Sequence, residues 1–296
     1  MIKWAGLEWG GFRFRFHPLF SILLLFSVIT GYAAEMLILF GIVLIHELGH
    51  LTAAKGFGWQ VREIQLLPFG GVLVVDEPGT VPAWEEIAVA LAGPLQNVLM
   101  IAFAAACKWA GLWSGGWWDY FMQANLIIAL FNLMPVLPLD GGKIMQSLLS
   151  YHLPYHRAIQ WCAAASLVVS LTIVGMAFLR IGSHGIKLNV LIIGLFLIFS
   201  NWHTYRSVPY LFLRFLMHRE ARAGGFIVKG ALAQPIVVNG RRKVADILRL
   251  FIKEKYHLIY VMDERGVIRA VLPEQRLLHT YFVDKKPGCA VSELLM

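Results

Sequence analysis

Charged residues are scarce in this chain of 296 residues: Lys, Arg, Asp and Glu make up 15% of it, whereas 58% of the residues are hydrophobic. A soluble domain of this size cannot bury so much apolar surface. The composition therefore excludes an ordinary soluble protein and indicates that much of the chain lies in a bilayer. Cysteines are few as well. The three of them are far apart, which excludes a disulfide framework and a paired-cysteine metal site.

Basic residues exceed acidic ones only in the last third of the chain. Residues 1–204 contain 10 Lys/Arg and 10 Asp/Glu, whereas residues 205–296 contain 16 and 8. The excess suits a domain held beside an anionic cytoplasmic leaflet, and an ordinary solvated basic surface explains it equally well. We expect no direct nucleic-acid partner.

Long apolar stretches fill the first two thirds of the chain. A helix needs about 20 residues to cross the hydrocarbon core of a bilayer. By that measure we expect six spans, near residues 17–33, 35–54, 86–107, 120–136, 158–179 and 186–204. Six spans place both termini on one side, where the ends and loops carry eleven Lys/Arg against three on the opposite side. The positive-inside rule then predicts cytoplasmic termini.

Composition divides the chain into three parts. Residues 1–204 form a predicted membrane domain, in which residues 61–75 read as a β-hairpin too apolar for a solvated loop, and so as a segment that re-enters the membrane. Residues 205–225 mix apolar side chains with four arginines, as an interfacial helix or a plain linker does, and Gly224-Gly225 predicts a hinge. The remainder, residues 226–296, is called the tail below. The predicted fold class is a mostly α membrane protein with a re-entrant hairpin and a C-terminal α/β domain.

The chemistry begins at the sequence His46-Glu47-Leu48-Gly49-His50. Side chains four residues apart share a helix face, so both imidazoles can bind one metal ion, and Glu47 can act as general base toward the attacking water. A chance match to this pattern is common in soluble proteins. Here, however, three ionisable residues lie in an apolar span, where each costs at least about 2.5 kcal/mol on insertion scales. Metal coordination offsets that cost.

A catalytic zinc site takes three protein ligands and leaves one position open. Asp140 is the only acidic residue between Asp119 and Glu220, so we expect it to be the third ligand of one zinc ion per chain. An Asp-Gly turn that ends a helix is the alternative interpretation of Asp140. Six other residues are candidates for substrate binding or for a structural role: Gly70, Gly71, Gly93, Asn97, Asn132 and Pro135.

The two motifs together resemble the site-2 protease family of intramembrane metalloproteases: HELGH lies in the second span, and NLMPVLPLDGG covers residues 132–142. The resemblance implies that His46, His50 and Asp140 bind zinc and that Glu47 is the catalytic glutamate.

Two further segments resemble parts of the same family. Residues 92–97 resemble its small-residue stretch, in which Gly93 and Asn97 let helices approach each other. Residues 61–75 resemble its re-entrant strands, which present a membrane-associated protein substrate in extended form. Strand addition makes physical sense, because a helical peptide bond is shielded by its own hydrogen bonds.

The tail is predicted to contain a helix at residues 244–256, strands at 257–263 and 267–272, and a closing helix, an order that resembles a single CBS domain. Pro273 and Arg276 stand where nucleotide-binding CBS domains often carry Ser/Thr and Asp. This departure argues against adenine-nucleotide binding, although Arg276 could meet a phosphate. A lone CBS repeat lacks its usual partner, so we expect a homo-oligomer.

A membrane core followed by a CBS tail resembles the sporulation branch of the family. That resemblance implies removal of the pro-sequence of a sporulation sigma factor near the cytoplasmic face. It also implies membrane-bound inhibitory partners and a place in the mother-cell membrane that surrounds the forespore.

A CBS-regulated metal transporter or channel is the alternative from another class, with buried histidines that pass zinc instead of using it. No inverted repeat of spans is visible, and a permeation site has no need of Glu47 between its ligands. An inactive, protease-like binding protein is a weaker alternative, because the expected zinc ligands and the expected catalytic glutamate are all present: His46, Glu47, His50 and Asp140.

Overall fold

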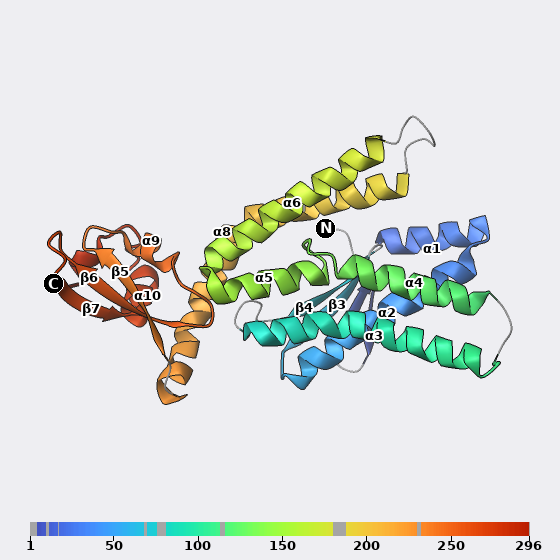
Figure 1. Ribbon diagram of the computed structural model, residues 1–296, viewed down its shortest axis with the longest axis horizontal. Coiled ribbons are helices and arrows are strands. Elements are labelled where there is room, and N and C mark those ends of the chain that lie inside the picture. Colours follow the sequence, from blue (N-terminus) through green and yellow to red (C-terminus); the bar gives the residue numbers. More distant parts are fainter. Residues whose placement is uncertain are drawn as a thin grey trace.

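Helices make up most of the computed structural model, which describes residues 5–9, 12–16, 18–67, 70–75, 81–112, 116–179, 188–229 and 232–295 (Figure 1). The helices are α1 (Pro18–Thr30), α2 (Ala33–Gly56), α3 (Ala83–Trp109), α4 (Trp117–Asn132), α5 (Asp140–His152), α6 (Tyr155–Leu179), α8 (Leu188–Lys229), α9 (Val244–Leu248) and α10 (Glu274–Phe282), and a 3-10 helix, η1, spans Val291–Leu295. A four-stranded sheet lies among the first helices, and a three-stranded sheet forms the tail at one end of the molecule.

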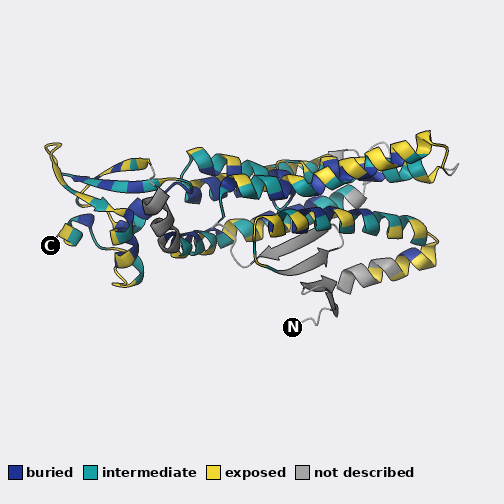
Figure 2. Cartoon of the chain, turned by 90° about the horizontal axis from the view of Figure 1, so that it is seen from below, coloured by how far each residue is buried: buried dark blue, intermediate teal, exposed yellow. Residues whose placement is uncertain are grey.

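Three helices in the described part of the chain are long and apolar enough to cross a membrane: α2, α3, and α6 over Tyr155–Phe178. They correspond to three of the six predicted spans. Their outer faces expose large apolar side chains, such as Phe103 at 65%, as expected of helices whose solvent is lipid (Figure 2). Helices α1 and α4 have 13 and 16 residues, fewer than a perpendicular span needs. The six-span topology and the cytoplasmic termini therefore stay predictions.

The predicted hairpin at residues 61–75 is present. Strands β3 (Val61–Leu67) and β4 (Gly70–Val75) pair antiparallel, and Gly70 and Gly71 stand at the start of β4. Two strands that the sequence interpretation missed extend this sheet: β1 (Ala5–Trp9) and β2 (Phe12–Phe16).

The sheet order is β1-β2-β3-β4, with β2 parallel to β3. This order places β4 at an outer edge of the sheet. The alternation of phenylalanine and arginine at residues 12–16 has the two-residue period of a strand, and it was the signal for β2. Re-entry of the hairpin into the membrane stays a prediction.

Helix α8 is continuous over 42 residues, so the predicted span at 186–204 and the predicted linker at 205–225 share one helix. The helix also runs through Gly224-Gly225, where a hinge was predicted. Glycine costs about 1 kcal/mol relative to alanine in a helix, and packing of α8 against the tail just before this pair offsets part of that cost. The division of the chain into three domains stays a prediction.

The tail has the order β5 (Ala233–Asn239), α9, β6 (Tyr256–Met262), β7 (Ile268–Pro273), α10. Strand β5 was not predicted; it pairs parallel with β6, which pairs antiparallel with β7. The helix predicted at 244–256 ends at Leu248, because the following residues turn toward the membrane helices and contact them. The resemblance to a CBS domain stays a prediction.

The hydrophobic core of the tail is continuous with two helices of the membrane part. Ile159 of α6 and Leu216 of α8 are fully buried in the same cluster as Ile259 of β6 and Leu277 of α10. The tail is therefore packed onto the ends of α6 and α8 rather than tethered by a free linker.

A buried charge cluster reinforces this junction. Arg219 of α8 donates two hydrogen bonds to the carboxylate of Glu274, at 3.1 and 2.9 Å. The ring of His257 accepts the backbone N–H of Ile252 at 3.2 Å through Nε2, and its Nδ1 lies 3.3 Å from the Glu274 carboxylate. Burial lowers the pKa of His257. Burial alone would raise the pKa of Glu274, but the hydrogen bond from His257 and the charge of Arg219 lower it overall.

Candidate metal centre

Three buried ligand atoms face one another at the centre of the membrane part. Nε2 of His46 lies 3.1 Å from Nε2 of His50, and Oδ2 of Asp140 lies 3.2 and 3.1 Å from these two nitrogens. Each residue is less than 5% exposed. Ligand atoms around a tetrahedral zinc ion stand about 3.3 Å apart, given bond lengths near 2.0–2.1 Å. The three side chains therefore fit zinc.

Different elements supply these ligands. The histidines lie one turn apart on α2, as their four-residue spacing predicts, and Asp140 is the first residue of α5. A carboxylate is favoured at that position by the helix dipole. Gly141 and Gly142 let α5 approach the preceding loop. A Cβ added to Gly141 would stand 2.1 Å from the carbonyl oxygen of Leu133, and one added to Gly142 would stand 2.5 Å from the backbone of residues 136–137.

Helix α3 orients both imidazoles. Nδ1 of His50 donates to the carbonyl oxygen of Val89 at 2.7 Å, and Nδ1 of His46 donates to Oδ1 of Asn97 at 2.6 Å. The amide of Asn97 in turn donates to Oδ1 of Asn125 on α4, at 3.0 Å. With the proton on Nδ1 in each ring, both Nε2 lone pairs point toward the ligand triangle and are available to a metal.

Gly93 closes one side of the centre. A Cβ at this position would stand 2.3 Å from Nε2 of His50 and 2.7 Å from Nε2 of His46. Only a residue without a side chain leaves the ligand triangle accessible from α3. This space, together with two imidazoles and a carboxylate as donors, is what a zinc site requires.

Glu47 lies beside the ligands, as the motif predicts. A carboxylate oxygen of Glu47 and one ring nitrogen each of His46 and His50 all lie within 4.8 Å of one another, and Glu47 is 5% exposed. On the other side of the centre, Nζ of Lys143 lies 3.1 Å from Oδ1 of Asp140. Asp140 therefore directs Oδ2 at the two histidines and Oδ1 at Lys143.

Of the other predicted site residues, Gly93 and Asn97 contact the histidines, whereas Gly70 and Gly71 lie at the start of β4. Asn132 ends α4 and donates to the carbonyl oxygen of Ile128 in its own helix, at 3.1 Å. Pro135 is exposed in the loop before α5. The roles of Val89, Asn125 and Lys143 were missed. Lys143 was detectable as the (i, i+3) neighbour of Asp140, whereas a backbone carbonyl carries no sequence signal.

Comparison with known proteins decides the family. The family model described as "Peptidase family M50" matches residues 34–113 and 101–173, which include both motifs. Stage IV sporulation protein FB of Bacillus subtilis is 32% identical over 296 residues, covering 100% of this chain and 99% of that protein. The chain belongs to peptidase family M50. A zinc metalloprotease of Methanocaldococcus jannaschii is 30% identical over 243 residues, covering 81% of this chain and 67% of the relative.

The fold agrees with this assignment. The solved site-2 protease from Methanocaldococcus jannaschii superposes with a TM-score of 0.57 at 24% identity, covering 69% of this chain and 95% of that one. The M50 chain is thus a membrane-embedded zinc metalloprotease of the site-2 type. Family membership also decides against the transporter alternative.

Proposed function

We propose that this M50 protein is an intramembrane endopeptidase that cleaves a membrane-associated protein near the cytoplasmic face, with His46, His50 and Asp140 as zinc ligands and Glu47 as catalytic base. The observation that carries the proposal is the buried triangle of ligand atoms on α2 and α5, with the Glu47 carboxylate beside it. Helix α2 is apolar and long enough to span, which supports a site below the membrane surface.

The mechanism follows from the placement of these side chains. Bound zinc would polarise the scissile carbonyl and make the attacking water more acidic. Glu47 takes the proton of that water and returns it to the leaving amine, as a general base that then acts as a general acid. Val89 and Asn97 keep the imidazoles in the tautomer that ligation requires. The buried site keeps bulk water away from the reacting bond.

The edge strand β4 supports strand addition as the mode of substrate binding. It is paired only on its β3 side within the described sheet. An extended substrate segment could pair with its other side, which would present the peptide bond without the hydrogen bonds of a helix.

We infer the natural substrate from the full-length similarity to a sporulation protein. The inferred substrate is the pro-sequence of a sporulation sigma factor, cleaved in the mother-cell membrane around the forespore under the control of membrane-bound inhibitory proteins. Both termini would face the cytoplasm, where such a substrate resides.

The tail supports a second part of the proposal, a homo-oligomer formed through a CBS-like domain. Val237 of β5 and Val271 of β7 align with Tyr260 of β6 on one face of the sheet and are 61% and 47% exposed. An apolar sheet face this open favours pairing with a second copy. Pro273 and Arg276 still argue against adenine-nucleotide binding at the tail.

Coexpression tests the proposed activity. The wild-type chain and Glu47→Gln would each be expressed with membrane-associated pro-sigma factors, and cleavage followed by immunoblotting. Glu47→Gln should retain zinc and abolish cleavage, because the general base is removed and the ligands are not. Cleavage at the wild-type rate by Glu47→Gln would overturn the mechanism.

A further inference from the structure

The first turn of α3 is held by the tail. The N–H of Ala83, at the start of this helix, donates to Oε1 of Glu254 at 2.8 Å. The first N–H groups of a helix have no partner within it, and Pro82, the N-cap residue of α3, provides no side-chain cap. A carboxylate from the tail, 171 positions away in sequence, satisfies one of them and also suits the positive end of the helix dipole.

A buried ion pair lies beside this cap. Nζ of Lys253 lies 2.7 Å from Oε1 of Glu86, and the Lys253 side chain is 0% exposed. The other oxygen of Glu86 accepts a hydrogen bond from Ser147 of α5 at 2.8 Å. Nζ of Lys253 makes no hydrogen bond of good geometry within the described residues, so the charge of Glu86 at ion-pair distance is what offsets the cost of burying the ammonium. The pair thus fixes the tail against α3 and, through Ser147, against the helix that begins with Asp140.

Glu86 lies on the face of α3 that forms the metal centre. Glu86, Val89, Gly93 and Asn97 follow at spacings of three, four and four residues, which place them on one stripe of a helix. On this stripe, Glu86 contacts the tail and the carbonyl oxygen of Val89 accepts from His50. Gly93 lies against both imidazole rings, and Asn97 accepts from His46. A shift of α3 along its axis would move all of them relative to α2.

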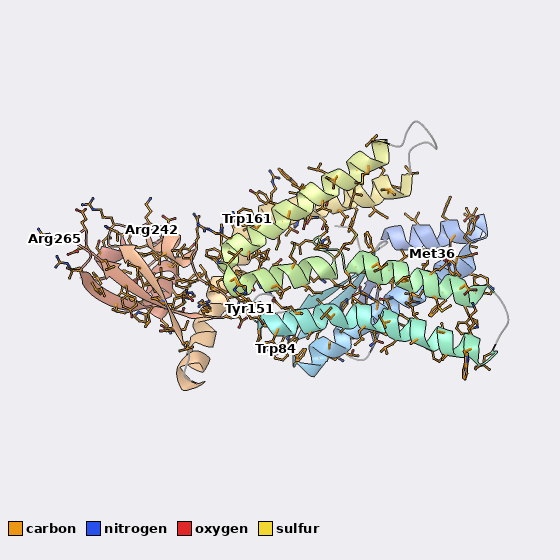
Figure 3. The ribbon with its side chains drawn as sticks, viewed as in Figure 1. Met36, Trp84, Tyr151, Trp161, Arg242 and Arg265 are labelled. Carbon is orange, nitrogen blue, oxygen red and sulfur yellow. The ribbon has the colours of Figure 1, made fainter. Side chains whose placement is uncertain are left out.

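The side-chain view agrees with this placement. Trp84 in the first turn of α3 and Tyr151 in the last turn of α5 lie at the end of the membrane part that faces the tail (Figure 3). Met36, near the start of α2, lies at the opposite end.

We propose that Lys253 and Glu254 of the tail are positioning residues of the metal centre, which act through α3 on the orientation of His46 and His50. The inference rests on the proposed metal site. In this arrangement the loop between α9 and β6 sets the register of the helix that holds the imidazoles. The tail is then a structural part of the catalytic centre, whatever else it binds.

Zinc release from the purified full-length protein tests the proposal, with a chromophoric chelator as acceptor. Lys253→Met, which keeps the length of the side chain and removes its charge, should release zinc about tenfold faster, at the lower end of the effect of groups that orient metal ligands. Glu86→Gln, which keeps the Ser147 contact, should do the same. The double variant should be no faster than either single variant, because all three lose one ion pair. Lys253→Arg should restore slow release.

Two controls separate positioning from general loss of stability. Lys255→Met removes a nearby exposed lysine that bonds Gln234 within the tail, and Val291→Ala shortens a fully buried side chain of η1 in the tail core. Both should release zinc at the wild-type rate. In the cobalt-substituted protein, the d–d absorption should change in Lys253→Met and not in the controls.

The outcomes are distinguishable. Wild-type protein that binds no zinc would remove the proposed metal site itself. If the wild-type protein binds zinc, two results would overturn this inference alone. One is release from Lys253→Met at the wild-type rate, and the other is release from Val291→Ala as fast as from Lys253→Met.

Discussion

The imidazoles of His46 and His50 are each fixed by an acceptor on α3, and their Nε2 atoms both lie against Gly93. That the two imidazoles face the same side of α2 was predictable from local spacing, since positions four apart share a helix face. Asn97 was singled out as a small residue for helix packing, and the structure shows that it is also the acceptor for His46, 51 positions away. Such a partnership depends on the packing of two helices, which a single sequence does not reveal.

Gly93→Ala tests the space at the metal centre. A methyl group there would overlap Nε2 of His50, so the variant should lose most of its zinc and its proteolysis while still inserting into the membrane. Gly175→Ala is the matched control, because a Cβ at that exposed helical position meets nothing within 4 Å. Zinc per chain, measured by mass spectrometry on both purified variants, checks the prediction. Equal, full occupancy in both would show that the metal lies elsewhere.

At the scale of elements, periodicity predicted α2, α3, α6 and the β3–β4 hairpin, because long apolar runs and a Pro/Gly turn between apolar strands are local signals. It placed the end of the helix at 244–256 wrongly, since the contacts of Lys253 and Glu254 with α3 compete with helix propensity. Strand β2 was missed because Arg13 and Arg15 were counted only among the basic residues that set the topology.

The backbone amides of strand β6 should lose protection from hydrogen exchange in acid because of His257. The folded tail holds this ring neutral with a lowered pKa, whereas an unfolded tail takes up a proton near pH 6.5. Tail stability should therefore fall as the pH drops below about 6.5. Glu274, whose pKa is lowered, adds a further loss at still lower pH.

Hydrogen exchange at pH 7.5 and 5.5, corrected for intrinsic rates, measures this effect in residues 256–262. His257→Gln should weaken the pH dependence, and His279→Gln, which changes a half-exposed ring, should leave it intact. The same pH dependence in His257→Gln and the wild type would assign the effect to another group.

On the scale of the whole molecule, membrane helices and tail form one structure around the metal centre. The family and the enzyme class were accessible from the sequence, because two short motifs carry the proposed ligands and the proposed base. The junction between the tail and the membrane helices was not accessible from the sequence. Arg219, Glu274 and Lys253 appear there as ordinary surface charges, and only the fold buries them. A tail that shares its core with α6 and α8 should not be removable without damage to the membrane part.

The number of zinc ions per chain in purified wild type, Glu47→Gln and Asp140→Asn tests the central claim most directly. We predict one zinc ion in the wild type and in Glu47→Gln, because the base is not a ligand. We predict a large loss of zinc in Asp140→Asn, since a neutral amide is a poorer ligand for the cation than a carboxylate. Full occupancy in Asp140→Asn, or loss of zinc in Glu47→Gln, would contradict the assignment of ligands and base.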